Sequence, residues 1–351
     1  MTGDPLIEVS GIAKEFPLAR TVREIVGRRS GRAIHAVDGV DLTIGAGESV
    51  GLIGESGSGK TTLGWLIARL HSSTGGTLRF EGADITHLSG GPLRAWRRNV
   101  QVVFQDPVGS LDPRLKVWQI VGEPIRAQQS GLGKAEVRRQ VAAILPTVGL
   151  PEDCLDHYPH QFSGGGRQRL SLARALSVDP KLVILDEPTS ALDVAVQAQI
   201  LNRLVELQRE RNVAYLMITH NVAAVRYVAD RLAVMYLGQL LEVGATRDVL
   251  EHPVHPYTKA LLAAVPQPDA RRRRTRYRIG GDIPTLIDPV PGCRFAPRCP
   301  YAQDRCRVAD PPLRPAPGRP RHLVACVRAE EVAEIAPSAL LQGAPEPNPV
   351  S

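Results

Sequence analysis

The sequence predicts an α/β protein built on a mostly parallel sheet, and three observations lead to this fold class. Short apolar runs alternate with segments of helical periodicity up to about residue 230. The apolar runs are continuous, which is typical of strands that are buried on both faces. A glycine-rich turn joins the first of these runs directly to a helical segment. Strands that alternate with helices pack as a sheet covered by helices, which is the α/β arrangement.

Four apolar runs are expected to be the strands of this sheet. They are "ESVGLIG" (48–54), "VQVVFQ" (100–105), "KLVILDE" (181–187) and "VAYLMITH" (213–220). Helical periodicity between and after them predicts helices at Lys60–Leu70, Lys134–Leu145, Gly166–Leu176 and Ala195–Arg211. The stretch 231–244 then alternates around Gly238 and predicts a β-hairpin.

The composition changes after about residue 262, and this change divides the chain. A basic run, "RRRRTRYR" (271–278), precedes a stretch rich in proline that also contains four of the five cysteines. We expect a large domain over residues 1–262, a small irregular Cys-rich module over 263–330 and a disordered tail over 331–351.

Overall composition excludes some classes of protein. The chain has 351 residues, of which 43% are hydrophobic and 23% charged, as is ordinary for a folded soluble protein. Aromatic residues make up only 4%, which disfavours a platform for stacking nucleic-acid bases. No apolar run approaches the ~18 residues needed to span a bilayer, and the first residues lack the apolar segment of a signal peptide. We therefore expect a cytoplasmic protein, in which disulfides are unusual.

The turn after the first strand carries a phosphate-binding motif. "GESGSGKTT" fits G-x-x-x-x-G-K-[ST] and comprises Gly54, Glu55, Ser56, Gly57, Ser58, Gly59, Lys60, Thr61 and Thr62. Glycines let the backbone curl so that successive N–H groups and the helix N-terminus face phosphate oxygens. The lysine would place its charge between the terminal phosphates, and Thr61 would offer its hydroxyl to Mg²⁺. The motif therefore predicts a nucleoside triphosphate site.

Polar side chains at three further strand ends suit the same chemistry. Asp186 ends an apolar strand and can complete the Mg²⁺ shell, and Glu187 is placed to accept a proton from an attacking water. Glu187 could instead cap the following turn. His220 could touch the γ-phosphate, or be a surface residue at a strand end. Gln105 could reach the metal or the water, or simply leave the sheet.

Taken in order, these motifs resemble those of the ATP-binding subunits of ABC transporters. The matching stretches are "GESGSGKT", Gln105, "FSGGGRQR" (162–169), "LVILDEP" (182–188), "SALD" (190–193) and "TH" (219–220), within about residues 6–245. The resemblance implies the ABC-type nucleotide-binding fold, with a RecA-like core, an antiparallel β subdomain and a helical subdomain at about 106–165. It also implies ATP hydrolysis in a head-to-tail dimer in which each subunit completes the other's ATP site.

The resemblance assigns a role to each matching residue. Mg²⁺ would be held by Thr61, Gln105 and Asp186, and Glu187 would be the general base. His220 would sense the γ-phosphate. Phe16, which ends the first strand, would stack on adenine, and Asp193 would join the two ATPases. The signature loop that contacts the partner's ATP would comprise Ser163, Gly164, Gly165 and Gly166; the family usually has glutamine at the last position.

Further stretches resemble the bacterial oligopeptide and dipeptide importers, closest to the second of their two ATPases. They are "VFQDPVGSLDPRLKV" (103–117), "YPHQFSGGGRQR" (158–169), "ALDVAVQAQILN" (191–202), "HPYTKALL" (255–262) and "PGCRFAPRCPYAQDRC" (291–306). The implied partners are a second, non-identical ATPase, two membrane permeases and an extracytoplasmic substrate-binding protein, with no direct nucleic acid. The implied location is the cytoplasmic face of the plasma membrane.

Other functions stay open. The same machinery imports nickel or other small solutes in some members of this family. A soluble ABC-type ATPase that acts on nucleic acid or ribosomes usually has two ATPase halves or a long coiled-coil insert, and this chain has one phosphate loop and no heptads. A regulatory subunit without hydrolysis would usually lack Glu187 or His220.

Four of the cysteines form a group of their own. Cys293, Cys299, Cys306 and Cys326 are spaced C-x5-C-x6-C-x19-C, wider than the spacing of a zinc finger. Four thiolates suit Zn²⁺ or an iron–sulfur cluster, and free thiols or disulfides stay an alternative. The resemblance to the peptide importers favours a [4Fe–4S] cluster with a structural role. Cys154 is expected to be an ordinary thiol.

Overall fold

The computed structural model describes residues 4–18, 32–129, 131–190, 192–264 and 285–335. The basic run at 271–278 and most of the tail expected after residue 331 lie outside these ranges. The chain divides into two compact units whose segments interleave along the sequence. The first unit takes residues 1–12, 41–52 and 61–230, and the second takes 13–40, 53–60 and 231–351.

A parallel sheet forms the centre of the first unit. Its strands lie in the order β3 (Ser49–Ile53), β8 (Ala214–Ile218), β7 (Leu182–Asp186) and β6 (Val100–Val103). These are the four strands predicted from the apolar runs, each shortened by one or two residues at its ends. Strands β3, β7 and β8 are buried at every position, which explains why their sequences are continuous rather than alternating.

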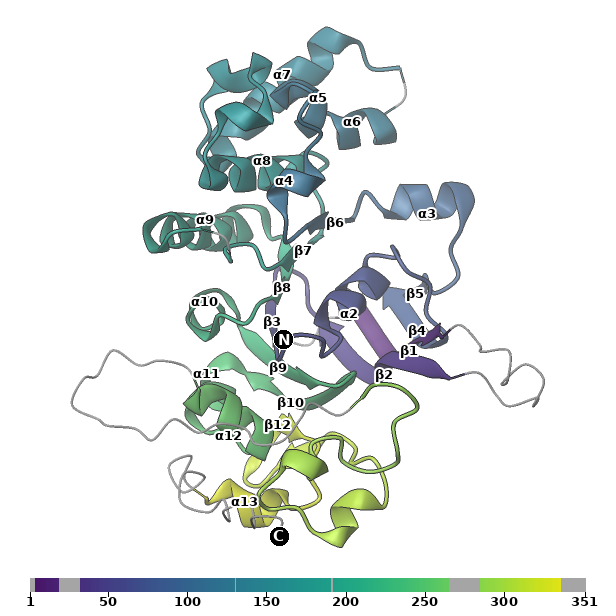
Figure 1. Cartoon of the computed structure of the whole chain (residues 1–351). Coiled ribbons are helices and arrows are strands. Elements are labelled where there is room, and N and C mark those ends of the chain that lie inside the picture. Colours follow the sequence, from purple (N-terminus) through teal and green to yellow (C-terminus); the bar gives the residue numbers. More distant parts are fainter. Residues whose placement is uncertain (1–3, 19–31, 130, 191, 265–284, 336–351) are drawn as a thin grey trace, which may run out of the picture. The chain divides into compact units, whose positions relative to one another are not determined.

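Helices cover both faces of this sheet. They are α2 (Lys60–Ile67), α8 (Gly164–Leu176), α9 (Val194–Arg211) and α10 (Val222–Val228). Figure 1 shows α9 and α10 on one side of the strands and α2 on the other. Leu185 and Met217 belong to the buried cluster shared with α8 and α9. Ile184 and Ile218 face α2, where a Cβ on Gly64 would lie 3.2 and 2.8 Å from them. This glycine therefore lets the helix approach the strands closely.

A group of short helices follows β6. It comprises α4 (Pro107–Ser110), α5 (Val117–Val121), α6 (Glu123–Gln128), α7 (Lys134–Ile144), η1 (Leu145–Val148), η2 (Glu152–Asp156) and η3 (Pro159–Gln161). The buried cluster that contains Leu185 continues through Val117, Trp118, Val137 and Val141 of this group. The helices thus share one core with the sheet. Cys154 is buried here, and burial raises the pKa of its thiol, as suits an ordinary core residue.

A second sheet has four strands in the order β2-β1-β4-β5. The strands are β1 (Ile7–Pro17), β2 (Ala33–Ile44), β4 (Gly75–Phe80) and β5 (Ala83–Asp84), and α3 (Gly90–Trp96) follows them in the chain. Strands β1 and β2 each run from one unit into the other. The sequence indicated only the first of these strands. Strands β4 and β5 are short and largely exposed, and β2 alternates between buried and more exposed positions instead of forming a continuous apolar run.

The second unit contains the hairpin predicted around Gly238. Strands β9 (Arg231–Tyr236) and β10 (Gln239–Ala245) pair antiparallel, and Leu237 and Gly238 both have positive φ in the turn between them. Helices α11 (Thr246–Glu251) and α12 (Pro256–Ala263) follow.

The C-terminal segment is more regular than the sequence predicted. Strand β12 (Arg319–Val324) pairs antiparallel with β10, β11 (Arg314–Ala316) pairs with β12, and α13 (Ala329–Ala333) follows. The expectation of a wholly irregular segment was wrong, because the prolines occupy positions that a sheet tolerates. Pro315 lies in the edge strand, and Pro320 precedes the two residues that pair with β10.

A buried carboxylate joins this segment to the hairpin. Glu242 of β10 has an Oε1 2.7 Å from His322 Nε2 of β12, and it accepts backbone N–H groups of Val254 and His255 at 2.7 and 2.9 Å. Both side chains of the Glu242–His322 pair are essentially unexposed. Within the ranges that the structure describes, no helix is long and apolar enough to cross a membrane.

Candidate functional site

At two positions of the glycine-rich loop after β3, the backbone conformation and the surrounding atoms leave room only for glycine. Gly54 and Gly59 have φ of +156° and +100°. A Cβ on either would lie 2.1 Å from a carbonyl oxygen, that of Met235 for Gly54 and that of Ala36 for Gly59. Contacts that short do not occur, so the loop depends on the missing side chains. Gly57, at φ +78°, has open space around it.

Lys60 is held inside this loop. Its Nζ donates to the carbonyl oxygens of Gly54 and Glu55 at 2.9 and 2.8 Å and to Ser58 Oγ at 3.2 Å. Lys60 and Ser58 are buried, whereas Ser56 and Gly57 are exposed and Thr62 is half-buried. The ammonium group is therefore fixed at the N-terminus of α2, where the helix dipole adds to its positive charge. This arrangement suits a polyanionic ligand.

Thr61 and Asp186 lie within hydrogen-bond distance of each other. Thr61 Oγ1 donates to Asp186 Oδ1 at 3.2 Å, and Asp186 is buried at the end of β7. A hydroxyl and a carboxylate are the oxygen ligands that Mg²⁺ takes in phosphate-binding sites. These two residues would hold the ion.

Glu187 and His220 also lie together. Glu187 Oε1 is 2.8 Å from His220 Nδ1, and the glutamate side chain is 12% exposed while the histidine side chain is 70% exposed. Glu187 has a φ of +50°, a strained conformation for a non-glycine residue. Its second oxygen, Oε2, is buried and has no hydrogen-bond partner among the described residues. That oxygen is able to accept a hydrogen bond from a water molecule.

Gln105 and Phe16 lie at two different sheets: Gln105 follows β6 of the parallel sheet, and Phe16 lies in β1 of the four-stranded sheet. Gln105 is exposed just beyond β6, and β6 pairs in parallel with β7. Both strands therefore end at the same edge of the sheet, the edge of Asp186. Phe16 is half-buried in β1, and Lys14 Nζ lies 5.2 Å from the centre of its ring.

The signature loop begins a helix. Ser163 is the N-cap of α8, and its Oγ accepts the Gly166 N–H at 3.2 Å. Ser163 and Gly164 are exposed, whereas Gly165 is buried. A Cβ on Gly165 would lie 2.4 Å from Val196 Cγ1, so the valine packs directly against the glycine backbone. The exposed end of this helix leaves backbone N–H groups open to an anion.

Asp193 caps the next helix in the chain. Its carboxylate accepts the Val196 N–H at 2.9 Å at the start of α9. Val194 beside it is an apolar side chain that is 82% exposed.

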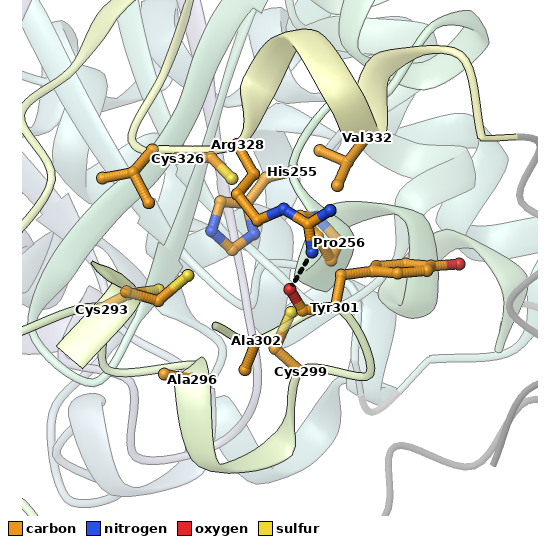
Figure 2. A pocket seen from close by; sticks show the side chains of 12 residues that line it. His255, Pro256, Cys293, Ala296, Cys299, Tyr301, Ala302, Cys326, Arg328 and Val332 are labelled. Atoms are coloured by element: carbon orange, nitrogen blue, oxygen red, sulfur yellow. Dashed lines mark hydrogen bonds between the residues drawn. The ribbon is translucent and has the colours of Figure 1, made fainter. Parts of the chain in front are cut away.

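The four cysteines of the C-terminal segment gather around one small cavity. Cys293, Cys299, Cys306 and Cys326 line it together with His255, and Figure 2 shows this cavity. Burial raises the pKa of Cys293 to about 12 and that of Cys299 to about 11, so these thiols are protonated at neutral pH.

No metal site is preformed in this cavity. In the ranges that the structure covers, no three His, Cys, Asp or Glu side chains form a group arranged to hold a metal ion. The cavity measures about 20 Å³, which is room for a single water or ion. The four cysteines that the sequence grouped thus line one cavity, but the described residues show no metal-binding arrangement there.

His255 also lines this cavity, although no local motif in the sequence marks it as a site residue. It is fully buried, and burial lowers its pKa to about 3, so the ring is neutral. Its Nδ1 accepts the Tyr257 N–H at 3.0 Å, which places the ring proton on Nε2. That N–H lacks a hydrogen-bond partner in the described part of the chain.

Comparison with known proteins identifies the class. The model of the ABC transporter family matches residues 37–190, and the model of the oligopeptide/dipeptide transporter C-terminal region matches residues 241–306. A Brucella ovis relative named for peptide import and ATP binding is 43% identical over 328 residues, 93% of this chain and 99% of the relative. The oligopeptide transport ATP-binding protein OppF of Escherichia coli is 42% identical over 301 residues, 85% of this chain and 89% of OppF.

Solved structures agree with this match. The dimeric structure of MJ0796, a bacterial ABC transporter cassette, has a TM-score of 0.60 at 28% identity and covers 69% of this chain and 99% of that one. The same cassette in a post-hydrolysis state with ADP and Pi gives the same values. The phosphate loop, the acidic strand end and the capped glycine helix thus define an ABC-type ATPase. More particularly, the chain belongs to the ATP-binding subunits of the oligopeptide/dipeptide family of ABC transporters.

Proposed function

We propose that this chain hydrolyses ATP to power the import of oligopeptides or dipeptides through a membrane transporter. The observation that carries the proposal is that the Thr61–Asp186 and Glu187–His220 pairs occur in one chain with a C-terminal region of the oligopeptide/dipeptide transporter type. The names of the Brucella ovis relative and of OppF support the peptide substrate. Residues 1–262 would be the ATPase cassette, and the segment from 263 would extend it.

Each side chain of the site would have one task. The loop 54–62 would cradle the phosphates of ATP, with Lys60 supplying positive charge. Thr61, Asp186 and Gln105 would hold Mg²⁺, an ion that neutralises charge on the phosphates. Glu187 would take the proton of the attacking water through its unpartnered Oε2, while His220 fixes Oε1 and reaches the γ-phosphate. Phe16 would stack on adenine.

The assembly would contain two ATPases. Ser163 and the glycines after it would contact ATP held by the partner ATPase, and Asp193 would join the two subunits. Two permeases and an extracytoplasmic binding protein would complete the importer, with this chain at the cytoplasmic face of the membrane. ATP binding would close the dimer, and this closure would drive the permeases between two states.

The function is tested by finding the partners and then the substrate. We expect tagged protein from gently solubilised membranes to co-purify with permeases, and ATP hydrolysis in proteoliposomes to rise when the binding protein carries a peptide. A rise with nickel instead would support import of a small solute. Co-purification with ribosomes and no membrane protein would contradict the proposal and favour the soluble alternative.

Gly166 allows a direct test of the signature loop. A Cβ at this position would lie 3.0 Å from Phe162 Cβ and 3.1 Å from its Cδ1, so the half-buried ring must shift slightly. We expect Gly166→Gln to hydrolyse ATP at the parent rate or up to about tenfold faster, because one polar contact contributes about 0.5–1.5 kcal/mol. Hydrolysis is measured with the partner ATPase present.

Gly166→Ala is the matched control for this variant, because it adds the Cβ without the amide. If both substitutions severely reduce the rate, the glycine itself is required beside Phe162. If only Gly166→Gln changes the rate, the amide is responsible.

We further propose that the cysteine quartet holds a metal centre. The gathering of four thiols and the unpartnered His255 N–H around one cavity supports this. A [4Fe–4S] cluster is what the family resemblance implies, and a single Zn²⁺ is the alternative that four thiolates also suit. Either group would supply a structural link for the segment, and His255 would donate a hydrogen bond to a thiolate.

Metal analysis separates these cases. Protein purified without oxygen is expected to be brown, to absorb near ~400 nm and to contain iron if a cluster is present. Colourless protein with about one zinc per chain would identify the zinc alternative. Cys299→Ser is expected to lose the metal, whereas Cys154→Ser, which changes a buried thiol outside the quartet, should keep it. Parent protein without iron or zinc would refute a metal centre.

A further inference from the structure

Arg298, in the C-terminal segment that contains the four cysteines, contacts the phosphate loop. Arg298 ends the short helix η4 (Ala296–Arg298), directly before Cys299. Its Nη1 donates to Glu55 Oε2 at 2.8 Å, and its Nη2 donates to Glu55 Oε1 at 3.3 Å. The arginine side chain is 6% exposed and the glutamate 23%. Two hydrogen bonds from a buried guanidinium to both oxygens of a half-buried carboxylate fix the distance and the orientation of the pair.

The same arginine is itself held firmly. Nη1 also donates to Tyr236 Oη at 3.0 Å, and the guanidinium lies 5.8 Å from the centre of that ring. Burial alone would lower the pKa of Arg298, but the hydrogen bonds to Glu55 and Tyr236 outweigh burial and raise it. The tyrosine ring packs edge-on against Phe295 of the same segment. Arg298 is therefore a permanent, oriented cation.

Glu55 connects this cation to the lysine of the loop. The Glu55 N–H donates to Tyr257 Oη at 2.8 Å, and its carbonyl oxygen accepts from Lys60 Nζ at 2.8 Å. The residue is thus held at its side chain, its N–H and its carbonyl. A change in the backbone conformation of Glu55 would move the carbonyl oxygen that accepts from the Lys60 ammonium.

The negative charge of the Glu55 carboxylate also bears on phosphate binding. Glu55 is the second residue of a loop that binds a polyanion, so an uncompensated carboxylate there would repel the phosphates. The guanidinium of Arg298 compensates that charge at hydrogen-bond distance.

We propose that Arg298 is a positioning residue of the ATP site, which neutralises Glu55 and, through the Glu55 carbonyl, sets the position of Lys60. The C-terminal segment thereby determines how tightly the phosphate loop holds ATP. The Ala296 N–H donates to the Cys293 carbonyl oxygen, and the Arg298 N–H donates to the Phe295 carbonyl oxygen. These hydrogen bonds connect the arginine to the turn that begins at Cys293. The inference rests on the proposed function, because it concerns affinity for ATP.

The test is a double-mutant cycle on the purified chain, read as the Kd for ATP with Mg²⁺ and as KM and kcat for hydrolysis. Arg298→Gln is expected to raise the Kd and KM for ATP about tenfold and to leave kcat at saturating ATP within about twofold, because it exposes the loop to the Glu55 charge. Glu55→Gln removes that charge and should change Kd less. The double variant is expected to bind ATP better than Arg298→Gln alone, at roughly threefold above the parent Kd.

Further variants separate positioning from folding. Arg298→Lys keeps the charge without the paired geometry and should lie between the parent and Arg298→Gln. Arg247→Gln breaks an exposed ion pair with Glu251 in the same unit and should leave ATP affinity unchanged. The melting temperature of every variant is measured. Should Arg298→Gln not fold, the cycle is run with Arg298→Lys in its place.

The binding measurements distinguish failure of the Arg298 inference from failure of the proposed function. Parent affinity in Arg298→Gln, or losses that simply add in the double variant, would overturn the inference while leaving the proposed function intact. Failure of the parent protein itself to bind ATP would instead refute the proposed function.

Discussion

Glu187→Gln is expected to bind ATP with the parent affinity and to hydrolyse it at least about 100-fold more slowly. The substitution keeps the size of the side chain and the hydrogen-bond acceptor facing His220 Nδ1, 2.8 Å away in the parent. It removes the basic Oε2, the buried oxygen that has no partner among the described residues. Because the proposed function assigns ATP binding to the loop 54–62 and hydrolysis to Glu187, the two properties should separate.

The measurement compares steady-state phosphate release with equilibrium ATP binding. Glu206→Gln is the control, since Glu206 is an exposed carboxylate on α9 that pairs with Arg203. The control should keep both the parent rate and the parent affinity. Hydrolysis by Glu187→Gln at the parent rate would exclude Glu187 as the general base, and loss of ATP binding would assign it to binding instead.

Local patterns predicted most of the ATPase fold. A run such as "LVILD" is buried at every position of β7, so its sequence shows a continuous apolar segment that can be recognised without any partner. The phosphate loop is equally local, because one turn of backbone and one helix start supply its chemistry. The pairing of Glu187 with His220 follows from neighbouring strands, since the last residue of β7, Asp186, lies opposite Ile218 of β8.

Long-range pairing explains what the sequence did not predict. Strand β12 exists because Leu323 and Val324 pair with β10, about 80 residues earlier. A window with prolines at 311, 312, 315, 317 and 320 gives no local sign of this. The contact of Arg298 with Glu55 spans 243 residues and depends on the same docking of the C-terminal segment. Neither residue differs locally from an ordinary surface charge.

Gly59→Ala is expected to lower ATP affinity by more than about 100-fold, whereas Gly57→Ala should lower it by about tenfold or less. Both glycines lie in the same loop with positive φ, +100° and +78°, so both substitutions carry the strain of a left-handed residue, of order 1–2 kcal/mol. The two differ in surroundings. A Cβ at position 57 meets nothing within 4 Å, but one at position 59 would lie 2.1 Å from the Ala36 carbonyl oxygen.

That overlap cannot be relieved by a side-chain rotation, because the atom in the way belongs to the backbone of β2. Either the strand or the loop must move, and the loop carries Lys60 as its next residue. Equilibrium ATP binding and melting temperature are measured for both variants. If Gly59→Ala loses affinity while its melting temperature stays near that of Gly57→Ala, the loop has yielded and the strand has not. Equal affinities in the two variants would mean that the close approach to Ala36 does not constrain the bound loop, and that the positive φ alone accounts for both glycines.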